Sequence, residues 1–75
     1  MKITILSPRA VVFDGEAASV ILPGDESEFE LLDHHAPIVS LLRPGHVTIN
    51  GQREVPVKKG MVKFDRNVCM ILTEE

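Results

Sequence analysis

Turn-forming residues interrupt this sequence at short, regular intervals and leave no stretch long enough for a well-formed helix. The turn signals are Asp14-Gly15, Pro23-Gly24, Pro37, Pro44-Gly45, Asn50-Gly51, Lys59-Gly60 and Arg66-Asn67. The longest interval between them, residues 25–36, does not repeat its apolar residues at helical spacing and lacks capping residues at both ends. This punctuation predicts an all-β chain.

The segments between the turns are short and rich in valine, isoleucine and threonine, as β-strands are. We expect strands at residues 3–6, 11–13, 18–22, 29–32, 38–42, 47–49, 55–57, 61–64 and 68–72. Such a series is typical of a flattened antiparallel β-sandwich or barrel with two sheets and about nine to ten strands. At 75 residues there is room for one core only, so residues 1–75 are predicted to form one domain.

Local features refine the expected strand arrangement. Asn50-Gly51 tolerates positive φ at both positions and can close a two-residue hairpin between residues 47–49 and 53–57. Pro56 cannot donate a ladder hydrogen bond, so its strand should lie at a sheet edge or on a bulge. Pro23-Gly24 and Pro44-Gly45 each predict a type II-like turn. Residues 20–22 and 69–72 are apolar on both faces and should need cover from a loop or another protein.

Composition excludes several classes of function. With a net charge of −3, no tryptophan, no tyrosine and three phenylalanines, the chain lacks the basic and aromatic surface that nucleic-acid binding requires. No apolar run approaches the roughly 18 residues of a membrane span, so direct membrane insertion is not expected. The single cysteine, Cys69, excludes an internal disulfide framework. Within an apolar strand its thiol should be inert.

The charges divide unevenly along the chain. Every charged residue from position 14 to position 33 is acidic, whereas bases predominate from position 34 to position 73. One interpretation is a solvated strand surface that keeps a small domain soluble. The other is an acidic patch that meets a basic partner.

The residues that could support chemistry are few. Asp33-His34-His35 is the most suggestive run, but adjacent histidines on an extended chain point to opposite faces. A metal site would have to combine one of them with His46 and a carboxylate. No serine lies in a nucleophile elbow, and the glycines do not form a phosphate-binding loop. A small cupin-like metal-binding protein that uses His34, His35 and His46 remains an alternative hypothesis.

An ordered series of short motifs is more distinctive. It comprises Ser7-Pro8, Phe13-Asp14-Gly15, Leu22-Pro23-Gly24, Glu28-Phe29, His35-Ala36-Pro37-Ile38, Leu42-Arg43-Pro44-Gly45 and a closing segment from Gly60 to Leu72. In order and spacing the series resembles the N-terminal β-sandwich domain of the epsilon subunit of F-type ATP synthase, called delta in mitochondria. The resemblance covers nearly the whole chain. It departs from the family pattern at Ser27, Glu30, His34 and Lys58-Lys59, where glycine or serine is usual, which leaves loop details open.

The resemblance implies a non-catalytic rotor subunit without a cofactor. It would bind the gamma subunit and the polar loops of the c-ring, and so couple proton flow to rotation and ATP synthesis. It would lie at the cytoplasmic face of the bacterial inner membrane as part of that complex. Family members typically carry a C-terminal helical hairpin that inhibits ATP hydrolysis. This chain stops before it, so we expect neither that latch nor its ATP site.

The family's contact positions transfer to particular residues here. Ser7, His35 and Ser40 fall at positions that face gamma in the family. Glu28 falls at the position that meets an arginine of the c-ring loop, and Asp25 and Glu26 lie in the same acidic segment. Ile38, Leu42 and the strands that are apolar on both faces are expected to supply most of the apolar contact with gamma. Such an assignment predicts two partner surfaces, one apolar and one acidic.

Overall fold

The computed structural model describes residues 1–74, which form nine strands and no helix. The strand bounds are β1 (Lys2–Leu6), β2 (Val11–Glu16), β3 (Ser19–Pro23), β4 (Glu28–Leu32), β5 (Ile38–Leu42), β6 (Gly45–Ile49), β7 (Arg53–Val57), β8 (Gly60–Asp65) and β9 (Val68–Thr73). Each predicted strand is present, most of them one or two residues longer than expected. No helix among these residues is long and apolar enough to cross a membrane.

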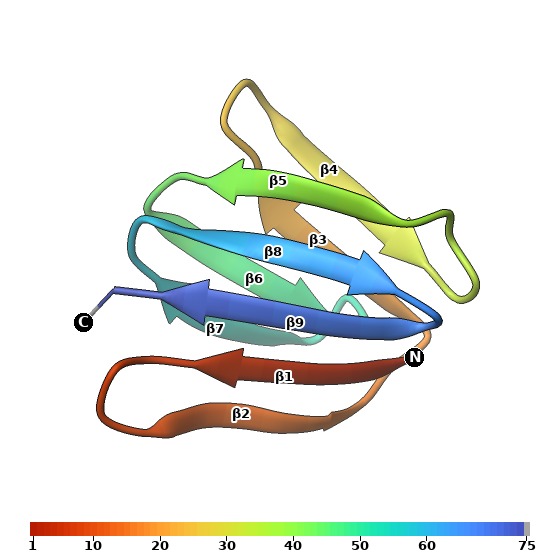
Figure 1. Cartoon of the computed structure of the whole chain (residues 1–75), viewed down its shortest axis with the longest axis horizontal. Helices are drawn as coiled ribbons and strands as arrows, with labels where there is room; N and C mark the ends of the chain where they lie inside the picture. Colours follow the sequence, from red (N-terminus) through yellow and green to blue (C-terminus); the bar gives the residue numbers. More distant parts are fainter. Residues whose placement is uncertain (75) are drawn as a thin grey trace.

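The strands form two layers, as predicted for a β-sandwich (Figure 1). Sheet A has the order β2-β1-β9-β8-β5 and lies in front in Figure 1, and sheet B has the order β4-β3-β6-β7. One strand pair departs from the predicted antiparallel arrangement, because β1 pairs with β9 in parallel. The other strand pairs are antiparallel. The first and last strands therefore lie side by side in the middle of sheet A.

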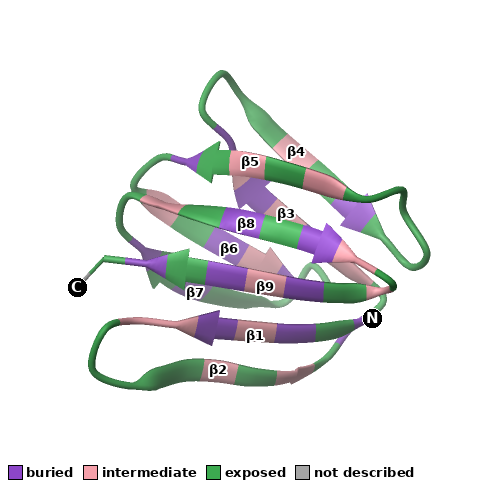
Figure 2. Ribbon diagram, in the orientation of Figure 1, coloured by how far each residue is buried: buried purple, intermediate pink, exposed green. Residues whose placement is uncertain are grey.

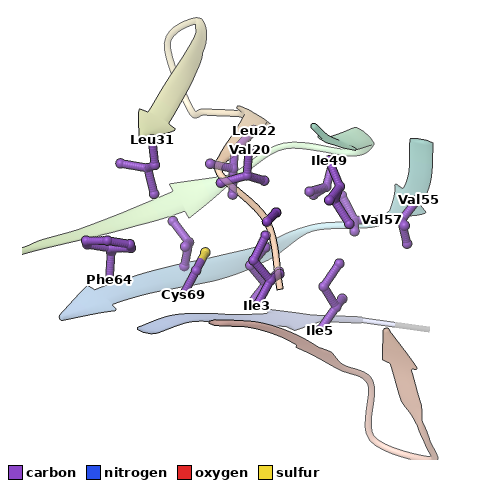
Figure 3. Packing of buried hydrophobic residues seen from close by; sticks show 14 of the residues in the cluster. Ile3, Ile5, Val20, Leu22, Leu31, Ile49, Val55, Val57, Phe64 and Cys69 are labelled. Carbon is purple, nitrogen blue, oxygen red and sulfur yellow. The ribbon is translucent and has the colours of Figure 1, made fainter. Parts of the chain in front are cut away.

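Alternate residues of each sheet point into one apolar core between the layers (Figure 2). Ile3 and Ile5 of β1, Cys69 of β9 and Phe64 of β8 meet Val20 and its neighbours from sheet B (Figure 3). Burial raises the pKa of the Cys69 thiol to about 11, so the side chain is a small apolar residue at neutral pH, as the sequence predicted. The buried side chains of the described residues form one hydrophobic cluster between the sheets.

Left-handed backbone positions shape the hairpin turns. Asn50 (φ 54) and Gly51 (φ 66) are both positive, as predicted. The hairpin is longer than the predicted two residues, however, because Ile49 pairs with Arg53 and leaves Gln52 in the loop as well. Arg66 (φ 51) and Asn67 (φ 61) form the two-residue turn between β8 and β9. Asparagine is found fairly often in the left-handed region, but arginine is uncommon there, so Arg66 is the unusual residue of this turn.

The two Pro-Gly pairs act differently from the prediction. Gly51 alone among the described glycines has positive φ, so Gly24 and Gly45 cannot occupy the third position of a type II turn. Gly24 is instead required by a close approach, because an added Cβ would lie 2.5 Å from the Ser27 carbonyl oxygen. Ser27 and Glu30 have negative φ, so the acidic loop needs no glycine at either position. The loop follows a path that the residues present can adopt.

The edges of the sandwich are protected in different ways. Pro56 lies in β7, an edge strand of sheet B, as its missing N–H predicted. On that side the Arg53 guanidinium lies 5.1 Å from the centre of the Phe13 ring and joins β7 to β2. On the opposite side, Gly24 forms a β-bridge with Leu42, and the Arg43 N–H donates to the Pro23 carbonyl at 2.8 Å. Both seams between the sheets are therefore closed by side-chain or backbone contacts.

The start of the chain is anchored as well. The Met1 amine donates to the Ala17 carbonyl at 2.7 Å and also contacts the Asp33 carboxylate. The hydrogen bond from this amine lowers the pKa of Asp33. Asp33 is one of the acidic residues that the sequence left available for a basic partner, and the structure pairs it within the chain.

Substitution of Gly60 tests the closest approach at any of the described glycines. An added Cβ would lie 1.9 Å from the Leu72 carbonyl oxygen, so Gly60→Ala must separate β8 from β9 and should lower the free energy of unfolding by at least about 2 kcal/mol. Gly51→Ala is the comparison, since nothing lies within 4 Å of its Cβ position. It should cost only about 1 kcal/mol through its positive φ. Urea unfolding measures both, and equal losses would contradict the close approach.

Candidate functional site: the outer face of sheet A

A row of apolar side chains crosses the outer face of sheet A, with one residue from every strand. The strand register places Leu41 beside Met61, Met61 beside Leu72, Leu72 beside Leu6, and Leu6 beside Val11. Leu41 is 61% exposed, Met61 36%, Leu72 45% and Val11 61%, while Leu6 is half-buried. We call these five residues the apolar row. A continuous apolar stripe of this kind is the usual mark of an interaction surface.

The apolar row borders a shallow groove. The groove has a volume of about 310 Å³ and is lined by Pro8, Leu41, Lys59, Gly60, Met61, Leu72, Thr73 and Glu74. Its lining is mostly apolar, and Lys59 and Glu74 are its charged members. An interface with an apolar centre and a polar rim has this composition.

The outer face of sheet A becomes more polar away from the apolar row. The next register row is Val39, Lys63, Met70, Thr4 and Asp14, and the row after it contains Asp65, Val68, Lys2 and Glu16. Charges of both signs therefore accompany the apolar side chains toward the other end of the strands. The arrangement offers apolar contact at one end and orienting polar groups at the other.

The structure separates the residues that the sequence analysis assigned to a gamma-binding surface. Leu42 is only 3% exposed, and its side chain packs in the core, so it offers no contact area. Leu41, the preceding residue, is the one that faces outward. Ile38 and Ser40 share the inward side of β5 with Leu42, but they are half-buried because β5 is an edge strand. The sequence analysis identified strand β5 correctly, but it assigned the outward position to Leu42, whereas Leu41 is the leucine that faces outward.

Ser7 and His35 lie near the two ends of sheet A. Ser7 directly follows the apolar-row residue Leu6, and its hydroxyl accepts a hydrogen bond from the Ala10 N–H at 3.2 Å within the β1–β2 loop. His35 precedes β5 and is exposed, with its ring edge-to-face against Phe64 at 6.1 Å between centroids. Both residues have structural contacts within the chain, and the roles assigned to them in binding stay predictions.

The acidic segment is divided by the fold. Asp14 and Glu16 lie on β2, at the edge of sheet A remote from β4 (Figure 1). Asp25, Glu26, Glu28 and Glu30 are exposed and gather on the β3–β4 hairpin, which we call the acidic hairpin. The acidic patch expected from the sequence is therefore smaller than the acidic segment.

The acidic hairpin and β5 enclose a second groove. Its volume is about 450 Å³, and its lining includes Asp25, Glu26 and Ser27 on one side and Val39, Ser40 and Leu41 on the other. Leu41 thus belongs both to this groove and to the apolar row. The apolar and acidic surfaces meet at this strand.

No group of three histidine, cysteine or carboxylate side chains within residues 1–74 is arranged to hold a metal ion. His34 and His35 lie in the β4–β5 loop, whereas His46 is on β6 of the other sheet. The cupin-like alternative has no support in this arrangement.

The structure adds Leu41, Met61, Leu6 and Val11 to the candidate surface. Leu72 belongs to a segment that the sequence analysis already marked as apolar on both faces. The other four could be recognised only from the register of the strands, because they form a row only when five separate strands are aligned. A single strand such as β8, with Met61, Lys63 and Asp65 on its outer side, does not indicate it.

Known proteins resemble this chain over its whole length. A family model for the ATP synthase delta/epsilon chain β-sandwich domain matches residues 1–75. The ATP synthase epsilon chain of Sulfurimonas denitrificans is 36% identical over 78 residues, which cover 99% of this chain and 60% of the relative. That of Wolinella succinogenes is 42% identical over 69 residues, covering 87% of this chain and 53% of the relative. This chain thus spans at most about 60% of the length of these two relatives.

Solved structures share the fold. A chain in the central stalk and c-ring structure of the Tetrahymena thermophila mitochondrial ATP synthase superimposes with a TM-score of 0.78 at 20% identity, covering 99% of this chain and 63% of that one. A chain in the OSCP/F1/c-ring structure of the Euglena gracilis mitochondrial ATP synthase superimposes with a TM-score of 0.77 at 23% identity, covering 95% of this chain and 48% of that one. At these identities the likeness concerns the β-sandwich alone.

Leu41 and Leu42 provide a direct test of which side chain of β5 faces outward. Leu42→Ala should lower the free energy of unfolding by about 2–4 kcal/mol, because it leaves a cavity in the core. Leu41→Ala should change it by no more than about 0.5 kcal/mol, as is usual for an exposed position. Thermal or urea unfolding of the two variants measures the difference. A larger loss for Leu41→Ala would reverse the assignment of the two faces.

Proposed function

This chain belongs to the ATP synthase delta/epsilon chain β-sandwich family, and we propose that it is a non-catalytic rotor subunit that binds gamma through the outer face of sheet A. The observation that carries the proposal is the apolar row, which crosses all five strands of that sheet. In this role the chain helps to join the central shaft to the c-ring, so that proton flow stays coupled to rotation and ATP synthesis. The catalytic work belongs to other subunits.

The apolar row suits a protein partner for energetic reasons. Removing exposed apolar side chains from water favours association in proportion to the buried area. A few large side chains at the centre of an interface commonly supply most of the affinity. Leu41, Met61 and Leu72 are adjacent by register and share one groove, so a single partner surface can cover all three at once.

The acidic hairpin is proposed to meet the c-ring. Its four carboxylates stand together on exposed positions, whereas the apolar row carries none. In the family the residue at the Glu28 position faces an arginine of the c-ring loop, and Asp25 and Glu26 would reinforce that attraction. An exposed ion pair adds only about 0–1 kcal/mol, so this contact mainly sets orientation and speeds docking.

The proposed position of the chain follows from this role. It would lie at the cytoplasmic face of the bacterial inner membrane, held there by gamma and the ring rather than by insertion into the bilayer. The two grooves share Leu41, so the gamma and c-ring surfaces would adjoin along β5. One rigid sandwich could then touch both partners at once.

Introduction of a charge into the apolar row tests gamma binding. Leu41→Lys should weaken the affinity for purified gamma by about tenfold or more, because it places a cation within the proposed apolar contact. Leu32→Lys is the matched control, since Leu32 is also exposed (54%) but lies on β4 of sheet B. Isothermal calorimetry or biolayer interferometry would give both affinities. Failure of the unaltered chain to bind gamma at low and moderate salt would exclude the proposed role.

A second substitution separates the two partners. Glu28→Arg should weaken binding to a c-ring–gamma assembly about three- to tenfold more than binding to gamma alone, since it reverses the charge offered to the ring. Glu54→Arg on β7 is the control for a general change in net charge. Pull-down with detergent-solubilised ring assembly compares the variants. Equal weakening toward both partners would show that Glu28 does not face the ring.

A further inference from the structure

The tip of the β6–β7 hairpin carries a chemically reactive pair of residues, Asn50 and Gly51. Both are exposed, and no atom lies within 4 Å of the position that a Cβ of Gly51 would occupy. An asparagine side chain is attacked most readily by the backbone nitrogen of the next residue when that residue is glycine, because no Cβ hinders the approach. The pair is therefore a candidate site of spontaneous deamidation.

The carboxamide of Asn50 is held by the start of β3 and the residue before it. Its Oδ1 accepts hydrogen bonds from the Ala18 N–H at 2.8 Å and from the Ser19 N–H at 3.3 Å. The Asn50 N–H donates in turn to the Ser19 carbonyl at 2.9 Å. We call Ala18 and Ser19 the β2–β3 corner. Three hydrogen bonds thus attach the hairpin tip to this corner, two of them through the group that deamidation would destroy.

The backbone of the tip is fixed as well. Asn50 (φ 54) and Gly51 (φ 66) are both left-handed, and the Gln52 N–H donates to the Ile49 carbonyl at 3.1 Å. Deamidation requires the Asn50 Cγ to come within bonding distance of the Gly51 nitrogen. The carboxamide must leave the β2–β3 corner to reach that position, because its oxygen is otherwise occupied by two donors. The closed turn therefore resists the reaction.

Detachment of the tip does not require the sandwich to unfold. Asn50, Gly51 and Ala18 are all exposed, and none of them belongs to the hydrophobic core cluster. Breaking the three hydrogen bonds exposes no buried apolar side chain of these residues. Segments with exposed hydrogen bonds and few buried contacts open locally, at a smaller free-energy cost than global unfolding.

We propose that Asn50 is a deamidation site whose reactivity is gated by local detachment of the hairpin tip from the β2–β3 corner. The inference does not depend on the proposed function, since it follows from the contacts of this chain alone. Each modified molecule would be a permanent record that its tip had opened.

The reaction needs only water as a co-reactant. The Gly51 nitrogen, having lost its proton, forms a bond to the Asn50 Cγ; the Cγ–Nδ2 bond breaks and Nδ2 leaves, protonated, as ammonia. The product is a five-membered succinimide ring. Water then adds to one of the two ring carbonyls and breaks its bond to the Gly51 nitrogen. Opening at Cγ gives aspartate, and opening at the Asn50 main-chain carbonyl carbon gives isoaspartate.

The two products should differ in their effect on the fold. Aspartate keeps an oxygen that can accept from Ala18 and Ser19, and it tolerates positive φ, so Asn50→Asp should leave the unfolding temperature nearly unchanged. Isoaspartate carries the main chain through the side-chain carbons, which lengthens the tip and moves the free carboxylate. It should detach the tip from the β2–β3 corner and lower the unfolding temperature.

A comparison of reaction rates tests the gating. The folded chain and a synthetic peptide of residues 46–55 are incubated together at mildly alkaline pH, and peptide mapping by mass spectrometry follows aspartate and isoaspartate at position 50. Three hydrogen bonds, each worth roughly a factor of five in the opening equilibrium, predict a reaction about 100-fold slower in the folded chain. Low concentrations of urea should change this rate little, because local opening exposes little surface.

The measured rate decides between three cases. A rate within about threefold of the peptide rate would overturn the gating, since the closed turn would then react freely. A rate more than about 1,000-fold slower, rising steeply with urea, would overturn local detachment, because only the globally unfolded chain would then react. A rate between these limits with little dependence on urea supports the proposal.

The chain offers matched controls. Asn67 also has positive φ (61), and its Oδ1 also accepts a backbone hydrogen bond, from the His34 N–H at 2.7 Å, but β-branched Val68 follows it. It should stay unmodified in the same samples, and equal modification there would contradict a reaction that depends on glycine. Gly51→Ala should slow the reaction in both the chain and the peptide, because the added Cβ hinders the attacking nitrogen.

Discussion

The parallel pairing of β1 with β9 is the contact on which the rest of the structure depends. It joins the first strand to the last and places both in the middle of sheet A, with β2 beside β1 and β8 beside β9. Without it sheet A would divide into the β2-β1 hairpin and a β9-β8-β5 group, each with an exposed strand edge. The same pairing sets the register that puts Leu6 beside Leu72. The apolar row on the outside and the alignment of Ile3 with Cys69 on the inside are consequences of one set of hydrogen bonds.

The two outer faces of the sandwich differ in character. On sheet B, Glu30, Ile21, Thr48 and Glu54 form one register row, so carboxylates stand at both ends of it. On sheet A the corresponding position is occupied by the five residues of the apolar row. A small domain with limited core volume gains nothing in its own stability from exposed leucine and methionine. The apolar row gathers exposed apolar side chains on sheet A, beside rows that carry charges of both signs, and this is the arrangement expected of the proposed docking face.

The sequence predicts the strands better than it predicts their pairing. Turn residues and β-branched segments located each strand, and the missing N–H of Pro56 correctly indicated an edge. The β1–β9 pair could not be anticipated, since parallel pairing of strands so far apart in sequence leaves no local signal. The Pro-Gly pairs were misinterpreted because proline and glycine permit a type II turn without requiring it. At Gly24 the need is space beside Ser27, which depends on the fold of the whole loop.

The candidate surface was only partly visible in the sequence for a related reason. The alternation along β5 leaves Leu41 and Leu42 chemically equivalent, and only the burial of one of them distinguishes the outer side from the core. In the sequence Asp33 likewise looks like an acidic residue that is available to a partner, but in the structure its carboxylate pairs with the amine of Met1. The family resemblance predicted contact positions and partners, whereas the arrangement of side chains into an apolar row and an acidic hairpin could be seen only in the three-dimensional structure.

The central claim is that a partner covers the outer face of sheet A. Methyl-labelled NMR of this chain, recorded as purified gamma is added, tests it most directly. The account predicts that the methyl signals of Leu41, Met61 and Leu72 shift or broaden first, while those of Leu32 and Ile21 on sheet B keep their positions. Perturbation centred on Leu32 and Ile21, with the apolar row unaffected, would contradict it.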